Sequence, residues 1–293
     1  MTQQVKGKKQ ISKPIAYAEY IVSLLIFSTN GLLVAQMSLD TGQVVLFRTL
    51  IGGAIVTALV MLKGGFDKEA VRAEARPLII AGAALGFNWV TLFAGYRLLN
   101  VSLATLIYYI GPMLALLLSP VFLGERLTKP KIAVAGVVAI GLILISGSIT
   151  FLGMNIKGLT FAGLSAACYA VLILANKNVH RTGGMQTAAI ELDVAFVVVL
   201  VCVLLTEGMP HPLASDIPYI IIIGAVNTGL AYYLYFAGVQ NLSAQTVSLV
   251  SYVDPVSALI LSGLVLHEVL TPLQFVGAVL IIGGAITGEL LRE

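Results

Sequence analysis

Long apolar runs separated by short polar connections make up most of this sequence. Each run is about as long as the roughly 20 helical residues that cross a bilayer core. The runs are continuous rather than alternating, which favours helices over transmembrane strands. We count ten of them, at 15–35, 43–62, 77–98, 101–122, 132–149, 157–176, 186–206, 217–238, 244–265 and 272–290. The pattern predicts an all-α integral membrane protein.

Composition supports this prediction. Hydrophobic residues make up 58% of the chain and charged residues only 11%, which is too little polar surface for a soluble globule of 293 residues. The lipid bilayer is therefore an expected partner.

The basic residues predict the orientation. If the N-terminus is cytoplasmic, all of the 17 basic residues except Arg48, Arg97 and Lys157 fall on the cytoplasmic side, as the positive-inside rule requires. We expect a multi-pass protein of the plasma (inner) membrane, with residues 1–14 as a basic cytoplasmic N-terminus and the C-terminus also cytoplasmic. The net charge of +3 thus reflects topology and gives no reason to expect a nucleic-acid partner.

The second half of the chain repeats the first at a fixed offset. Pro112 and Pro255 are 143 positions apart, and the same offset aligns "GFNWVTLFAGYRLLN" with "GLAYYLYFAGVQNLS". Such coincidences indicate a duplication. Each unit holds five predicted helices, so the second must enter the membrane upside down. The expected domains are a five-helix repeat at 15–150 and an inverted five-helix repeat at 151–293, an arrangement used by secondary transporters with a site between the repeats.

One run, "SLVSYVDPVSALILSGLVL", holds a carboxylate and a proline in its middle. Pro255 and its counterpart Pro112 each remove a helical hydrogen bond. At that depth in the membrane, backbone groups without a hydrogen bond are tolerated only where they are buried in protein or line a water-filled cavity. Both prolines are candidate coupling or gating residues. Asp254 has two interpretations: a proton or cation site, because burial disfavours its charged form, or a cap on the broken helix ends.

Other ionisable residues also fall inside the runs, where each costs at least about 2.5–3.5 kcal/mol at the centre. Arg48 and Glu191 occupy equivalent places in the two repeats. Arg48 is interpreted as a structural or gating tie to polar groups rather than as a substrate ligand. Glu191 is interpreted as a substrate or proton contact, with a bond to neighbouring backbone or tyrosine as the alternative.

Aromatic and amide residues cluster at mid-run positions. Aromatic faces can stack on flat solutes or hold cations, for about 0.5–2 kcal/mol per contact; an interfacial belt is the alternative. The candidate substrate-binding residues of this kind are Asn30, Asn88, Trp89, Tyr108, Tyr109, Asn227, Tyr232, Tyr235 and Tyr252.

Three stretches carry a family resemblance: "FRTLIGG" in the second run, "LGERLTKPKIAVAGVVAIGLIL" after the fourth and "LHEVLTPLQFVGAVLIIGGAIT" around the tenth. They resemble the drug/metabolite transporter superfamily, in particular its ten-span EamA family, over essentially the whole chain. His267 and "FSTNG" depart from the usual pattern, which weakens any transfer of a substrate. The resemblance implies an alternating-access carrier, with helices 1–4 and 6–9 around the cavity and helices 5 and 10 outside it.

The expected function is secondary active export of a small organic solute such as an amino acid, an amine or a drug-like metabolite, with a proton or another ion as a further partner. Import of a quaternary amine such as choline is an alternative. A non-transporting scaffold or a membrane enzyme is a third, but the three histidines lie in loops or at run ends, with no catalytic constellation. We expect no enzyme activity, cofactor or metal. "GAITG" at 284–288 leaves the chain a monomer or a weak homodimer.

Overall fold

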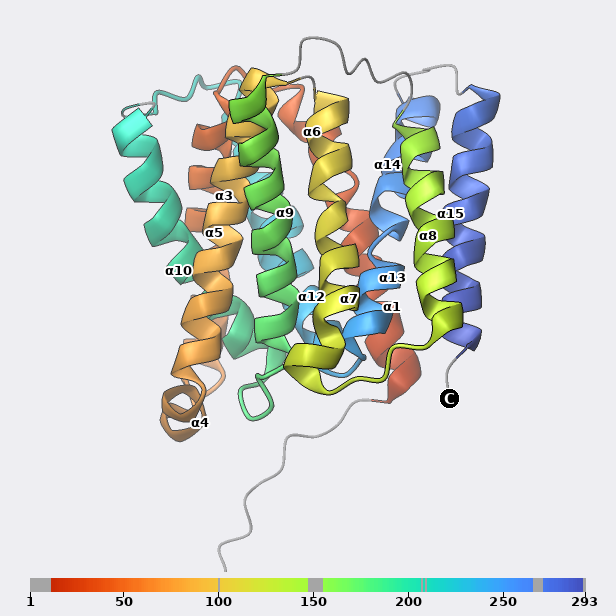
Figure 1. Cartoon of the computed structure of the whole chain (residues 1–293). Helices are drawn as coiled ribbons and strands as arrows, with labels where there is room; N and C mark the ends of the chain where they lie inside the picture. Colours follow the sequence, from red (N-terminus) through yellow and green to blue (C-terminus); the bar gives the residue numbers. More distant parts are fainter. Residues whose placement is uncertain are drawn as a thin grey trace, which may run out of the picture.

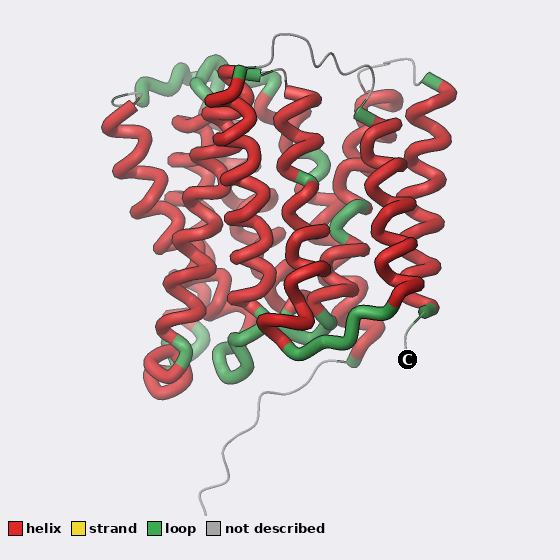
Figure 2. Tube along the Cα trace, in the orientation of Figure 1, coloured by secondary structure: helices red, strands yellow, loops and turns green. Residues whose placement is uncertain are grey.

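The computed structural model describes residues 12–99, 101–146, 155–206, 208, 210–265 and 271–291. Within these ranges the secondary structure is entirely helical, and the helices run side by side in one bundle (Figure 1 and Figure 2). The first half holds α1 (Lys13–Phe27), α2 (Asn30–Val34), α3 (Thr41–Leu62), α4 (Lys68–Ala73), α5 (Ala75–Leu98), α6 (Val101–Tyr108), α7 (Ile110–Leu123) and α8 (Lys129–Ile145). The second half holds α9 (Ile156–Asn176), α10 (Gly184–Thr206), α11 (Ile217–Gly224), η1 (Ala225–Leu230), α12 (Ala231–Val239), α13 (Ala244–Val250), α14 (Val253–Val265) and α15 (Pro272–Leu290).

Nine helical segments of the described chain are long and apolar enough to cross a membrane. The predicted helix at 132–149 is observed as α8, which starts earlier, at Lys129, and is 17 residues long; residues 147–149 and the predicted repeat boundary at 150/151 lie outside the described residues. α8 packs along α15. The start of α1 and the end of α15 lie on the same face of the bundle as α4, which is the lower face in Figure 1.

Two predicted helices are interrupted at equivalent places. The run at 101–122 breaks between α6 and α7, and the run at 244–265 breaks between α13 and α14. Each break comes shortly before a proline, Pro112 or Pro255, because proline cannot donate to the preceding turn. The Ser251 carbonyl, which Pro255 would leave unpaired, accepts a hydrogen bond from the Asp254 N–H at 3.1 Å.

A third departure from regular helix lies between α11 and α12. The segment η1 is π-helical, and the Thr228 hydroxyl donates to the Ile223 carbonyl, five residues back, at 2.8 Å. Single π-helical turns are frequent at functional sites because they re-aim side chains. Here the turn carries Asn227 and Thr228 toward α1 and α3.

Small residues let several helices approach closely. A Cβ atom on Gly141 of α8 would lie 2.7 Å from the Gly277 carbonyl oxygen of α15, as in membrane helix pairs that pack through small residues. The face of α15 that carries Gly284 and Gly288 also points inward, against Val138 of α8 and Leu249 of α13. The "GAITG" stretch is thus occupied by internal packing.

Buried carboxylates fasten the connections between helices. Glu74, next to α5, accepts hydrogen bonds from the backbone N–H groups of His180, Arg181 and Thr182 and from the Thr182 hydroxyl, at 2.7–2.8 Å. Burial would raise the pKa of Glu74, but these hydrogen bonds outweigh it and hold the pKa below its ordinary value. The connection between α9 and α10 is therefore fixed to the start of α5.

Asp216 does the same at the opposite face. It accepts hydrogen bonds from the N–H and hydroxyl of Ser38 and from the N–H of Leu213. The two bonds from Ser38 and the one from Leu213 lower the pKa of Asp216. They tie the connection before α3 to the start of α11.

Candidate functional site

A cavity of about 500 Å³ lies inside the bundle. Residues at the end of α1, such as Phe27 and Ser28, line it, whereas the start of α1 lies on the face that holds both described termini. The cavity therefore lies in the half of the bundle away from that face. The sequence-predicted residues that line it are Asn30, Arg48, Asn88, Trp89, Tyr108, Tyr109, Tyr232, Tyr235 and Asp254.

Nine of the described residues that line the cavity are aromatic. Tyr108 stacks on Tyr169 with ring centroids 5.0 Å apart and planes 12° from parallel. Trp89 meets Tyr232 edge to face at 5.5 Å, and Tyr232 also packs on Phe27 at 4.7 Å. Paired rings of this kind form a rigid apolar wall, because aromatic side chains have few rotatable bonds. The wall can receive a flat or aromatic solute or the face-on approach of a cation.

Asp254 places a carboxylate in this aromatic wall. It lies in the first turn of α14 and accepts a hydrogen bond from the Tyr109 hydroxyl at 3.0 Å. The start of a helix favours a negative charge because the unpaired N–H groups point toward it. The side chain is only half-buried and lines the cavity. The helix break before Pro255 thus creates the position at which Asp254 can reach a solute.

Arg48 contributes the opposite charge. Its guanidinium lies 4.9 Å from the centre of the Trp89 ring, and its Nε donates to the Thr228 hydroxyl at 2.8 Å. A further bond from the guanidinium reaches the Asn227 carbonyl at 3.4 Å. The side chain is 6% exposed and lines the cavity. Arg48 is thus tied to the π-helical turn while still facing the enclosed space.

Five predicted residues do not line this cavity. Asn227 instead donates to the Ile26 carbonyl at 2.9 Å and to the Thr29 hydroxyl at 2.7 Å, which fixes the end of α1. The other four are Glu191, Tyr252, Pro112 and Pro255.

Two of these lie directly behind the wall. Tyr252 is almost completely buried, and its hydroxyl donates to the backbone carbonyl of Tyr109. Glu191 is fully buried on α10 and accepts a hydrogen bond from the Asn176 amide at 3.0 Å. Tyr252 therefore supports the cavity wall through its bond to Tyr109. Glu191 is not among the residues that line the cavity.

Sequence reasoning missed four aromatic residues of the wall, Phe27, Phe93, Tyr96 and Tyr169. Tyr169 lies in the middle of a predicted helix, so its depth was a usable signal. Phe27 and Tyr96 lie near helix ends, where aromatic residues are usually interfacial. Only their position in three dimensions identifies them as cavity residues.

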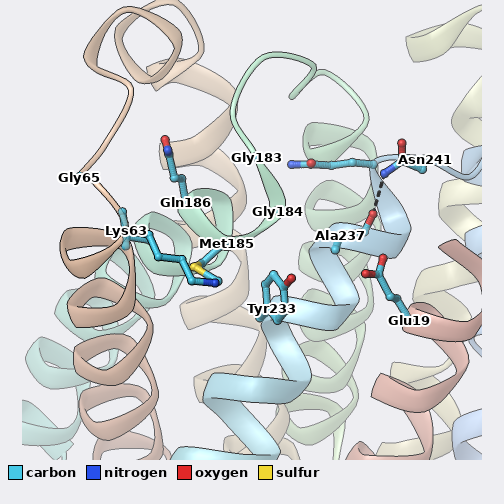
Figure 3. Close-up of a pocket in the computed structure, with 12 residues that line it drawn as sticks. Glu19, Lys63, Gly65, Gly183, Gly184, Met185, Gln186, Tyr233, Ala237 and Asn241 are labelled. Atoms are coloured by element: carbon cyan, nitrogen blue, oxygen red, sulfur yellow. Dashed lines mark hydrogen bonds between the residues drawn. The ribbon is translucent and has the colours of Figure 1, made fainter. Parts of the chain in front are cut away.

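A second pocket of about 380 Å³ lies on the face that holds the described termini. Figure 3 shows Glu19 of α1 and Tyr233 of α12 on its wall, with Lys63 extending into it from the end of α3. Along α1, the buried residues Tyr20, Ser23 and Leu24 separate Glu19 from Phe27 of the central cavity. The central cavity and the second pocket are therefore present in the same conformation, on opposite sides of a layer of buried residues.

The described residues contain no group of three or more histidine, cysteine, aspartate or glutamate side chains that could hold a metal ion. The charged groups of the central cavity are Arg48 and Asp254. The arrangement is therefore suited to binding an organic molecule through stacking, hydrogen bonds and charge.

Comparison with known proteins supports a transport role. The family model described as the EamA-like transporter family matches residues 15–147 and again residues 156–287. The "uncharacterized transporter YxxF" of Bacillus subtilis (strain 168) is 24% identical over 253 residues, which cover 85% of this chain and 81% of that protein. The "aromatic amino acid exporter YddG" of Ancylobacter novellus is 25% identical over 256 residues, covering 83% of this chain and 85% of that protein.

The fold is also found in solved structures. One crystal structure superimposes with a TM-score of 0.85 and 22% sequence identity, and the alignment covers 96% of this chain and 98% of that chain. At this identity the likeness shows the fold, and the nature of the solute has to be argued from the cavity.

Proposed function

We propose, from the premise that the chain belongs to the EamA-like transporter family, that it is a secondary transporter which moves a small organic solute across the plasma membrane by alternating access. The observation that carries the proposal is the central cavity, which presents an aromatic wall with Asp254 and Arg48. A buried layer separates it from the pocket on the other face. A carrier needs such a site, reachable from one side while the other is closed.

The architecture that we infer is ten spans in two inverted five-helix repeats, with the division near residues 150 and 151. α8, the fifth span in chain order, completes this count when it is added to the nine described helical segments that are long and apolar enough to cross a membrane. Equivalent elements of the two halves pack on each other, α3 on α10 and α8 on α15. Equivalent residues also meet, as Trp89 does with Tyr232. Contacts between equivalent positions are what a two-fold relation between the repeats produces.

We infer that the described conformation faces outward. The basic residues favour a cytoplasmic location for the face that holds the described termini. The central cavity lies in the other half of the bundle. In this view the pocket of Figure 3 is the cytoplasmic entrance or exit, closed off from the solute site.

Export of an amino acid, an amine or a drug-like metabolite is the favoured activity. A zwitterion could direct its ammonium group toward Asp254 and its carboxylate toward Arg48, with an apolar side chain against the rings. The relative named as an aromatic amino acid exporter adds support. Import of a quaternary amine is the second candidate, because Asp254 and the tyrosine rings also suit a cation without a carboxylate.

The test is counterflow in proteoliposomes with a panel of amino acids, aromatic amino acids and quaternary amines. We expect exchange of at least one solute, and solute-dependent thermal stabilisation of the protein in detergent. Tyr108→Ala should abolish both, whereas the matched change Tyr219→Ala, on α11 and outside the cavity, should leave them. If no solute in the panel is exchanged or bound, the proposed function is wrong.

The two candidate solute classes are separated by Arg48→Met. This change removes the partner for a carboxylate and should weaken amino-acid exchange strongly. Exchange of a quaternary amine should persist, since that solute would interact with Asp254 and the rings.

A further inference from the structure

A buried acid and a buried amide face each other outside the cavity. Asn176, at the end of α9, donates through Nδ2 to the Glu191 carboxylate at 3.0 Å and to the Leu172 carbonyl at 3.1 Å. Both side chains are completely shielded from solvent. The Glu191 Oε1 and the Asn176 Oδ1 have no hydrogen-bond partner. In each side chain, one polar atom is thus hydrogen-bonded and the other has no hydrogen-bond partner.

One proton would satisfy both orphan oxygens. Asn176 has no N–H left for a third acceptor, because both bonds of its Nδ2 are accounted for. A proton on Glu191 Oε1 would turn that oxygen into a donor, and the unpaired Asn176 Oδ1, on the amide that already bonds this carboxylate, is an available acceptor. A buried carboxylate without a cation is expensive, whereas the neutral, hydrogen-bonded acid is not.

No cation of the described chain bonds to the Glu191 carboxylate. α10 packs against α3, α5 and α12, and Asn176 belongs to α9. The ionisable residues of these four helices are Arg48 on α3; Arg76, Tyr96 and Arg97 on α5; Lys157, Cys168 and Tyr169 on α9; and Tyr232, Tyr233 and Tyr235 on α12. Among the described residues, the one hydrogen-bond donor to the Glu191 side chain is Asn176. Tyr232 and Tyr235 lie within electrostatic range of it.

The pair lies between the two hollow spaces. Toward the cavity, the Leu172 carbonyl that accepts from Asn176 belongs to a lining residue, and Tyr232 and Tyr235 are also part of that wall. Toward the other face, Gln240 lines the second pocket and donates to the Thr187 hydroxyl at 2.8 Å. Thr187 lies one turn before Glu191 on the same side of α10.

We propose that Glu191 and Asn176 form a proton-binding site, loaded in the described conformation and opened to the cytoplasmic pocket when the transporter changes state, and that this site couples proton movement to solute movement. The coupling role rests on the proposed transport function, whereas the bound proton does not. In each cycle the carboxylate takes up one proton in one state and releases the same proton in the other. In this proposal Asp254 contacts the solute, and Glu191 binds and releases the proton.

Infrared difference spectroscopy of the purified protein in detergent tests the bound proton without any transport. At neutral pH the wild type should show the carbonyl band of a hydrogen-bonded carboxylic acid that Glu191→Gln lacks. Asn176→Leu should shift that band, because it removes the amide partner. Asp193→Asn is the matched control on α10, since the Asp193 side chain is exposed and accepts a hydrogen bond from the Thr57 hydroxyl instead. Identical spectra for the wild type and Glu191→Gln would overturn the proposal.

Solute-driven proton movement, followed with a pH-sensitive dye inside proteoliposomes, tests the coupling. Glu191→Gln, which imitates the protonated acid, should retain solute counterflow and lose proton movement by tenfold or more. Asp193→Asn should retain both. Loss of solute binding in Glu191→Gln would instead assign Glu191 to the solute, and proton movement unchanged from wild type would exclude it from coupling. A wild type that exchanges no solute would refute the transport function and leave the spectroscopic result intact.

Discussion

The Tyr252 hydroxyl donates to the backbone carbonyl of Tyr109 at 2.8 Å, and the two residues are 143 positions apart in the chain. They therefore occupy equivalent places in the two halves, each at the break in its helix. Their rings also contact each other, with centroids 6.3 Å apart. Because the Tyr109 hydroxyl holds Asp254, this single bond joins both helix breaks to the cavity carboxylate.

Tyr252→Phe removes that bond and should lower the free energy of unfolding by about 1 kcal/mol, the usual value for a buried neutral hydrogen bond. The Tyr109 carbonyl is left without this partner, so solute affinity should also fall through the altered position of Tyr109. Thermal unfolding in detergent and solute-dependent stabilisation measure the two effects. Tyr233→Phe, on the wall of the other pocket, is the control; equal effects in both variants would contradict the supporting role of Tyr252.

Close packing of the broken helix gives a second prediction. A Cβ atom on Gly111 would lie 2.7 Å from the Ala166 carbonyl oxygen and 2.8 Å from the Tyr169 Cβ, both on α9. Gly111→Ala should therefore destabilise the protein by about 1–3 kcal/mol, as overpacking does, and displace Tyr169 in the cavity wall. A Cβ on Gly136 of α8 meets nothing within 4 Å, so Gly136→Ala should be neutral or stabilising. Unfolding curves of the two variants provide the comparison.

The apolar pattern was sufficient to predict an all-helical membrane protein because burial in lipid constrains both the length and the polarity of each span. The fixed offset also identified Trp89 and Tyr232 as equivalent, and the structure brings their rings together. The sequence predicted a disturbance of the helix near each proline but not the residues at which the helices are interrupted. Pro112 and Pro255 indicate where a helical hydrogen bond is lost. The residue at which each helix ends depends on which hydrogen-bond donors are available to the backbone carbonyls that the prolines leave unpaired.

The depth of a side chain was predictable, whereas the direction in which it points was not. Glu191 was expected at the cavity and lies behind it, because the rotation of α10 is decided by its packing against α3 and α5. Asn227 was expected to contact a solute, but the π-helical turn directs it to the end of α1. Tyr169 was missed because nothing in its sequence neighbourhood pairs it with Tyr108.

The carboxylate of Glu74 leads to a prediction about pH. Its pKa is lower in the folded protein than in the unfolded chain, so its contribution to stability is fully present above its unfolded pKa of about 4.3 and is lost as the pH falls through the folded value. Glu74→Gln should lower the free energy of unfolding by about 1.5–3 kcal/mol at neutral pH, the range for hydrogen bonds to a charged group. The difference between wild type and variant should shrink below about pH 4.

Unfolding followed as a function of pH in detergent checks this. Glu69→Gln, in the first turn of α4, is the control and should follow the wild type at every pH. A constant difference between Glu74→Gln and the wild type from neutral to acidic pH would show that the carboxylate charge plays no part in holding the connection between α9 and α10.

Asp254→Asn tests the charge in the cavity separately from the proton site. The amide retains an oxygen that can accept from the Tyr109 hydroxyl, so the fold should persist with a change in stability of less than about 1 kcal/mol. A solute that carries an ammonium group loses its counter-charge, and its affinity should fall about tenfold or more, which is about 1.4 kcal/mol. Binding measured by thermal stabilisation across a neutral, zwitterionic and cationic solute series shows whether the loss follows the positive charge.

Tyr109→Phe, which keeps the carboxylate and removes its hydrogen bond, should weaken binding less than Asp254→Asn does. An equal loss of affinity for neutral and cationic solutes would mean that Asp254 shapes the helix break and does not contact the solute.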